Sequence, residues 1–218
     1  MYTKFLFIFV IIFEAFRKNE GQVTIKDTVP ISKRFEAEGI VPHMIDCPPN
    51  YTATVTFPYD VRVFPGLILN ILEVDTKPRP RWRAIDDATY YTIIMISPDL
   101  PQHNVPYAEW NPWIVRNIPG LKRAKGQTII PYNMPEEPRR NATFLMYVFL
   151  IYKQNEYITY NDSYYQNEGM IERGEFRVRK YTQIYNLTCP EAGNYYVLTF
   201  YQPPAAVETT RSTVHFEW

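Results

Sequence analysis

Two long apolar runs constrain the fold of this chain most. Residues 90–96 and residues 144–152 are almost entirely aliphatic or aromatic, and the second run lies between Asn141 and Lys153. Strands that are buried on both faces of a sheet show this near-continuous pattern, because neither face needs polar side chains. The two runs therefore predict central strands that other elements cover from both sides.

Residues 51–57 show a different pattern, which is a strict alternation. Three threonines occupy one face of the segment, and the other face carries Tyr51, Ala53, Val55 and Phe57. A period of two residues with one apolar face predicts a strand that is buried on one side only. We therefore expect a single half-buried strand here.

Shorter elements are expected around these strands. Further strands are predicted at residues 61–64, 67–72, near Trp82, at 113–118 and at 195–201, and short helices at 31–38, with Gly39 as the stop signal, and at 175–187. The segment 78–82 reads Pro-Arg-Pro-Arg-Trp and is stiffened by its prolines. The sequence predicts a mainly β fold, a β-sandwich of two packed antiparallel sheets with a few short helices, in one domain.

The charge balance excludes one class of partner. The chain has 23 lysines and arginines against 23 acidic residues, so its formal net charge is zero. A protein that binds nucleic acid usually carries a basic excess, and none is present. We therefore expect no nucleic-acid partner.

The N-terminus predicts a secretory signal. Lys4 precedes an unbroken apolar run at residues 5–13, which is too short to span a bilayer as a transmembrane anchor. We predict a signal peptide at residues 1–21, with cleavage after Gly21, and a single domain at residues 22–218. The alternative is an apolar N-terminal strand or helix that packs on the fold.

Two further features favour a secreted, extracellular glycoprotein. Four Asn-x-Ser/Thr sequons are present, at Asn50, Asn141, Asn161 and Asn186, which is more than a chain of this length carries by chance. The only two cysteines, Cys47 and Cys189, each adjoin a proline, and an even number in a secreted chain favours a disulfide over two unrelated buried thiols.

Several segments carry a family signature. Ser-Pro-Asp-Leu-Pro at residues 97–101 is followed by Glu-Trp-Asn-Pro-Trp at 109–113, and further matching pieces lie at residues 39–49, 147–154, 176–181 and 185–195. In this order and spacing they resemble the phosphatidylethanolamine-binding protein family over residues 35–202. The resemblance implies a β-sandwich with a small pocket that takes phosphate-like anions, including the phosphoryl end of a phospholipid headgroup. The positions that match the pocket are Asp99, Pro101, Trp110, Asn111, Pro112, Pro138 and Tyr147.

The chain departs from the family where the anion binds. The family places one histidine at the position of Pro112 and another at the position of Leu145, and Ser97 replaces an aspartate. Losing two charge-assisted hydrogen bonds of roughly 1.5–3 kcal/mol each weakens phosphoryl binding by about two to four orders of magnitude. We therefore expect a pocket that prefers a small uncharged or lipophilic ligand, or a protein-interaction or inhibitory module whose pocket is degenerate.

No catalytic chemistry is visible in the sequence. The three histidines are far apart, and there is no Cys-x-x-Cys, no His-x-x-x-His and no Gly-x-Ser-x-Gly motif. We predict no catalytic residues, no metal ligands, no cofactor and no enzymatic activity. The expected partners are a phospholipid headgroup, a small apolar ligand or another protein.

Overall fold

The computed structural model describes residues 29–98, 109–135, 144–159, 173–174 and 176–200 of the chain. The predicted signal peptide at residues 1–21 lies outside this part. No helix within the described ranges is long and apolar enough to cross a membrane.

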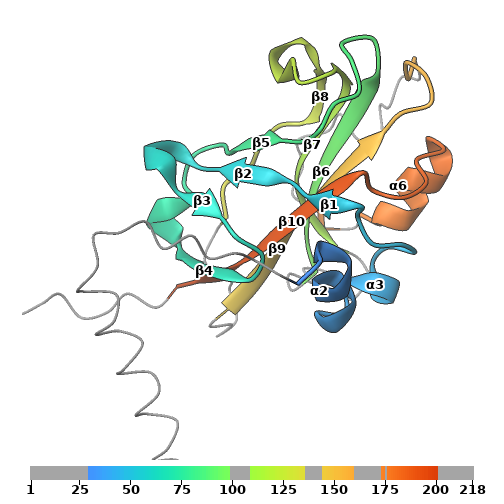
Figure 1. Ribbon diagram of the computed structural model, residues 1–218. Helices are drawn as coiled ribbons and strands as arrows, with labels where there is room; N and C mark the ends of the chain where they lie inside the picture. The colour runs from blue at the N-terminus through green and yellow to red at the C-terminus, as the bar shows by residue number, and fades with distance from the viewer. Residues whose placement is uncertain (1–28, 99–108, 136–143, 160–172, 175, 201–218) are drawn as a thin grey trace, which may run out of the picture.

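Two sheets form the scaffold (Figure 1). The large sheet has seven strands in the order β1-β10-β9-β6-β7-β8, with β4 also paired to β10, and the small sheet has the order β3-β2-β5. The large sheet contains β1 Tyr51–Thr52, β4 Leu67–Asn70, β6 Tyr90–Ser97, β7 Trp110–Pro119, β8 Gln127–Ile130, β9 Phe144–Lys153 and β10 Ala192–Thr199. The small sheet contains β2 Thr54–Thr56, β3 Arg62–Val63 and β5 Arg79–Arg81. Pairing is antiparallel except where β1 and β4 run parallel to β10.

Short helices connect and cover the strands. The α-helices are α2 Ile31–Ala37, α3 Ile40–His43 and α6 Val178–Ile184, and single 3-10 turns occupy η1 Pro58–Asp60, η2 Ile71–Glu73 and η3 Arg123–Lys125. Helix α2 ends as predicted, because Gly39 adopts a left-handed φ of 69° that favours glycine. The predicted fold class is confirmed.

The large sheet is buried on both of its faces. One face packs against the small sheet, with residues such as Ile93, Phe149 and Val55 in a common cluster. The other face packs against the helices, with residues such as Ile94 and Leu150. This arrangement explains the two apolar runs, and β6 and β9 are neighbouring strands near the centre of the sheet, as their sequences predict.

The alternating segment 51–57 differs in form from the prediction, as do residues 71–72, which lie in η2 and not in the predicted strand. Ala53, Val55 and Phe57 are at most 1% exposed, so the predicted apolar face is confirmed. However, the segment is two strands, because β1 pairs with β10 and β2 pairs with β3 and β5. The backbone N–H of Ala53 still donates to Gly193 O at 2.8 Å, and beyond this point the chain crosses from the large sheet to the small one.

Candidate functional site

The candidate pocket residues meet where β6 ends and where β7 and β9 begin. Ser97, the last residue of β6, pairs with Trp110, and the preceding residue of β6 pairs with Val148 of β9. Tyr147 in turn lies opposite Tyr196 of β10. The fold thus brings together Trp110, Asn111, Pro112 and Tyr147 from segments far apart in the sequence. Asp99, Pro101 and Pro138 lie outside the described residues.

Aromatic rings form the base of this region. The rings of Tyr147 and Tyr196 stack with centroids 5.3 Å apart and an interplanar angle of 13°, and Phe57, the residue after β2, meets Tyr196 edge-on at 5.7 Å. Burial raises the pKa of Tyr196 well above its ordinary value, so its hydroxyl stays neutral. Sequence analysis did not single out Tyr196, because its role follows from its register with Tyr147 and not from a motif.

The two positions that carry imidazoles in the family are apolar here and fully packed. Leu145 is 0% exposed and lies on the same face of β9 as Tyr147, within the core between the sheets. Pro112 is also buried and, as a proline, has no backbone N–H to donate. Neither side chain can donate a hydrogen bond to an anion.

Two neutral polar groups remain buried nearby. Asn111 donates from Nδ2 to Met95 O at 2.9 Å, at an irregularity in the pairing of β6 with β7. Its Oδ1 and the Ser97 hydroxyl have no hydrogen-bond partner among the described residues, and both residues are 0% exposed. A buried polar group without a partner is costly.

A buried arginine fixes the backbone of the site. The Arg173 guanidinium donates to Asn111 O at 3.3 Å, to Pro112 O at 3.0 Å and to Pro131 O at 3.0 Å. Pro112 O also accepts from the backbone N–H of Asn133 at 2.9 Å. Arg173 was not predicted from the sequence, since no local motif reveals partners 42 to 62 residues away. The positive charge of Arg173 is therefore directed at backbone carbonyls.

Glu109 is a further buried ionisable group at this end of the sheet. It is 6% exposed, and burial raises the pKa of its carboxyl to about 7. Its carboxylate accepts from the backbone N–H of Val178, and its own N–H donates to Phe176 O at 2.8 Å. These contacts join β7 to α6. Within the described parts of the chain, no three histidine, cysteine or acidic side chains cluster in a way that could hold a metal ion.

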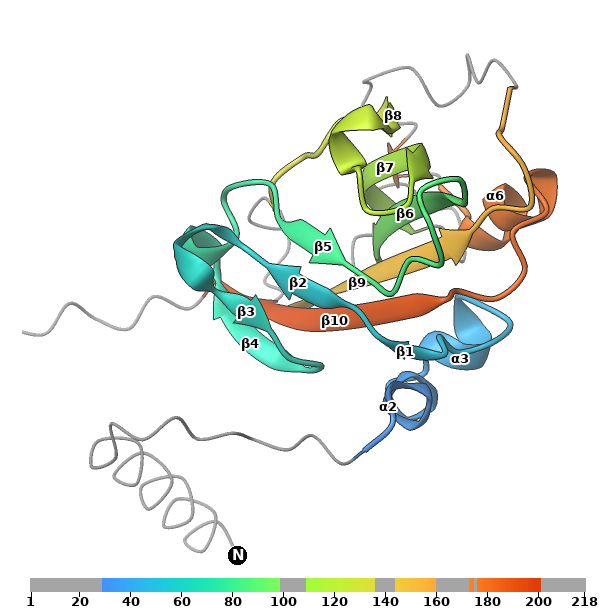
Figure 2. The ribbon, with the colours of Figure 1, turned by 45° about the horizontal axis from the view of Figure 1, so that its top comes forward.

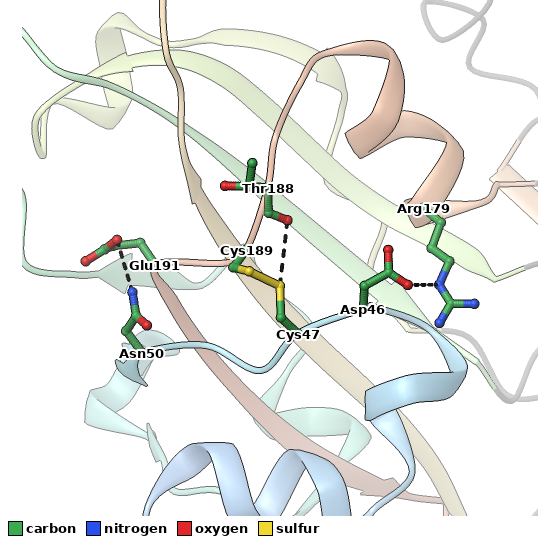
Figure 3. Close-up of a disulfide and its surroundings, with 7 residues drawn as sticks. All are labelled: Asp46, Cys47, Asn50, Arg179, Thr188, Cys189 and Glu191. Atoms are coloured by element: carbon green, nitrogen blue, oxygen red, sulfur yellow. Dashed lines mark hydrogen bonds and ion pairs between the residues drawn. A yellow bond between two sulfur atoms is a disulfide. The ribbon is translucent and has the colours of Figure 1, made fainter.

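The disulfide lies at another edge of the fold. Figure 3 shows Cys47 bonded to Cys189, with Cα atoms 5.6 Å apart, which confirms the predicted pairing. Asn50 lies three residues after Cys47 and Asn186 three residues before Cys189, and both asparagines are exposed. Asn50 Nδ2 donates to Glu191 Oε2 at 3.4 Å. Asn141 and Asn161 lie outside the described residues.

Comparison with curated proteins finds clear relatives, although no family model matches the sequence. The chain is 31% identical over 156 residues to "Putative odorant-binding protein A5" of Drosophila melanogaster, which covers 71% of this chain and 73% of that protein. It is 34% identical over 166 residues to the "26 kDa secreted antigen" of Toxocara canis, covering 74% of this chain and 62% of the antigen. It is 31% identical over 150 residues to "CEN-like protein 4" of Nicotiana tabacum, covering 68% of this chain and 81% of that protein.

Solved structures share the fold. The carboxypeptidase Y inhibitor, in complex with its cognate proteinase, superposes with a TM-score of 0.61 at 18% identity, covering 78% of this chain and 94% of the inhibitor. A phosphatidylethanolamine-binding protein from Plasmodium vivax superposes with a TM-score of 0.57 at 19% identity, covering 79% of this chain and 98% of that protein. At these identities the structural likeness bears on the fold alone.

Proposed function

This chain belongs to the phosphatidylethanolamine-binding protein family, and on that premise we propose that it is a secreted protein that binds a small neutral or lipophilic ligand in an altered headgroup pocket. The proposed ligand-contacting residues are Asp99, Pro101, Trp110, Asn111, Pro112, Pro138 and Tyr147. Asp99 adds a negative charge that disfavours an anion once no imidazole is present. The protein is proposed to be a binding protein and not an enzyme.

One observation carries this proposal. Leu145, at the position of a family histidine, packs at 0% exposure beside the stacked Tyr147 and Tyr196 rings. These apolar and aromatic side chains, with two unpartnered neutral groups nearby, Ser97 Oγ and Asn111 Oδ1, disfavour an anion and suit a ligand with a polar but uncharged end.

Secretion is proposed on independent grounds. A disulfide between Cys47 and Cys189 is typical of an oxidising compartment. One relative is named a secreted antigen and another an odorant-binding protein. We propose a signal peptide at residues 1–21, a mature domain at residues 22–218 and glycans at Asn50, Asn141, Asn161 and Asn186.

The pocket proposal is tested by restoring the missing donors. We would compare the secreted wild-type protein with a Pro112→His/Leu145→His variant for binding of phosphoethanolamine and of a neutral monoacylglycerol, by native mass spectrometry. Two imidazoles should raise phosphoethanolamine affinity by about two to four orders of magnitude. A Pro112→Ala/Leu145→Met variant adds no donor and should not. If the wild type already binds phosphoethanolamine as tightly as the double-histidine variant, the proposal is wrong.

A second candidate is a protein-interaction or inhibitory module with a closed pocket. Pro112 is buried, and its carbonyl is held by both Arg173 and Asn133, which favours a site that is filled by the protein itself. One protein of the same fold inhibits carboxypeptidase Y. This candidate would be favoured over the first if the purified chain inhibits carboxypeptidase Y and binds neither phosphoethanolamine nor the monoacylglycerol.

A further inference from the structure

A row of cations lies along one edge of the small sheet, outside the proposed pocket. From Lys77 to Arg83 the chain alternates between exposed basic residues and buried Pro78, Pro80 and Trp82. The exposed members are Lys77, Arg79, Arg81 and Arg83. Since alternate residues of an extended chain share a face, all four basic side chains point to the solvent side.

The prolines hold this segment extended. Lys77 and Arg79 each precede a proline, and a residue before proline is restricted to extended conformations. Arg79–Arg81 forms β5, an edge strand of the small sheet, where a proline costs no sheet hydrogen bond on the open side. At roughly 6.6 Å per two residues, the four charges span about 20 Å in a line.

Further arginines lie beside this row. In the small sheet Thr56 pairs with Arg79 on one side and with Arg62 on the other, so Arg62, Thr56 and Arg79 form a row across the solvent face. Figure 2 shows β2 between β3 and β5. The neighbouring rung places the buried residues Val63, Val55 and Pro80 on the opposite face. Thr54 pairs with Arg81 in the same way. The solvent face of the small sheet is thus built of arginines and threonine hydroxyls.

The guanidinium of Arg123, in turn η3, approaches the same surface. Burial lowers the pKa of Arg123, and the positive charges of Arg81 and Arg79 lower it further. In the described part of the chain the ion pairs join Lys33 to Glu36, Lys122 to Asp87 and Arg179 to Asp46, and none involves Arg62, Arg79, Arg81, Arg83 or Arg123. Clustered like charges that form no ion pair among the described residues repel one another, so stability does not explain the arrangement.

We propose that the surface formed by Lys77, Arg79, Arg81 and Arg83, with Arg62 and Arg123 beside them, binds a linear sulfated polysaccharide. Arginine forks match sulfate oxygens, and threonine hydroxyls add neutral donors between them. A linear row of charges fits a linear polyanion.

The aromatic rings beside the array argue against single-stranded nucleic acid. Such a ligand requires exposed rings on which bases stack. Here the Arg83 guanidinium covers one face of the Tyr51 ring at 5.0 Å from its centre, and Arg62 covers one face of Phe64, which is 42% exposed, at 5.4 Å. Arginines thus occupy ring faces on which bases would stack. A lipid surface would be bound by apolar side chains set between the charges. Buried residues occupy those positions between the basic residues of β5.

The experiment compares two variants with equal loss of charge. The purified full-length secreted protein is passed over an immobilised heparin dodecasaccharide at several salt concentrations, alongside Arg79→Gln/Arg81→Gln and Arg177→Gln/Lys180→Gln. The second pair removes two exposed charges at α6, remote from the small sheet (Figure 1). We expect the wild type to bind with an affinity that falls as salt rises. The sheet variant should lose about tenfold in affinity, and the helix variant less than about twofold.

Three results would overturn the proposal. The wild type could fail to bind heparin at low salt. The two variants could lose affinity equally, which would indicate a response to net charge only. Finally, the protein could bind vesicles of phosphatidylserine and phosphatidylcholine in preference to heparin, which would identify a lipid surface as the partner. Matching thermal unfolding of all three proteins shows that any difference arises at the surface.

Discussion

The carboxylate of Glu109 accepts a hydrogen bond from the backbone N–H of Val178 at 3.2 Å, across 69 residues of sequence. The contact ties the start of β7 to the first turn of α6, beside the β-bridge between Glu109 and Phe176. Because the carboxyl is almost completely buried, desolvation raises its pKa to about 7 from 4.5.

This raised pKa predicts a dependence of stability on pH. The folded protein binds the Glu109 proton more tightly than the unfolded chain does. The free energy of unfolding should therefore fall as pH rises from about 4.5 to about 7, by up to about 3 kcal/mol, and this contribution should be constant above pH 7. Urea unfolding between pH 4.5 and pH 8 measures the slope.

The Glu109→Gln variant is the matched control for this dependence. Glutamine keeps an acceptor for the Val178 N–H but does not titrate. Above pH 7 the unfolding free energies of wild type and variant should depend on pH with the same slope. Below pH 7 only the wild type should show the additional slope that comes from Glu109. An identical pH profile for the two proteins would show that another group is responsible.

Much of the fold follows from the sequence, because burial pattern and strand pairing are linked. The apolar runs at 90–96 and 144–152 predict central strands, and β6 and β9 occupy that place. The division of residues 51–57 between two sheets could not be predicted. Alternation reports which face is buried, and it does not report which neighbouring strand supplies the hydrogen bonds.

The site was less accessible to sequence reasoning. Trp110, Asn111, Pro112 and Tyr147 were predicted through a family motif, whereas no motif pointed to Arg173 or Tyr196. Arg173 acts on backbone carbonyls, which carry no sequence signal of their own. Tyr196 acts through its register with Tyr147, and register is a property of the folded sheet.

A buried amide network predicts a large loss of stability when Gln154 is replaced. Gln154 Oε1 accepts from the Asn117 N–H at 2.8 Å and from the Thr92 hydroxyl at 2.9 Å, and Nε2 donates to Asn117 Oδ1 at 2.8 Å. Gln154→Leu leaves these groups unsatisfied and should cost about 3–5 kcal/mol in urea unfolding. Gln127→Leu, at an exposed position of the same neighbourhood, should cost about 1 kcal/mol. Equal losses would contradict this account of the network.

The disulfide predicts a dependence of stability on oxidation. Cys47 and Cys189 are separated by 142 residues, and closing a loop of this length removes chain entropy from the unfolded state. The Cys47→Ser/Cys189→Ser variant should lose about 4–5 kcal/mol of unfolding free energy in the chain-entropy model. Guanidinium unfolding of the variant and of wild type, each with and without reductant, measures this. The reductant should destabilise only the wild type, and an equal effect on both proteins would assign it elsewhere.

Arg173 provides the last prediction, because it holds the backbone on which the proposed pocket depends. Its planar guanidinium spans the carbonyls of Asn111, Pro112 and Pro131, and a lysine ammonium is a single point donor that cannot reach all three. Arg173→Lys should therefore cost about 2–4 kcal/mol, although its charge is unchanged. Exchange of the Asn133 amide hydrogen, which is bonded to Pro112 O, should accelerate more than that of amides in β9. Arg177→Lys, at an exposed position, is the matched control and should alter neither quantity. If Arg173→Lys left the Asn133 exchange rate unchanged, the guanidinium would not be what fixes this segment.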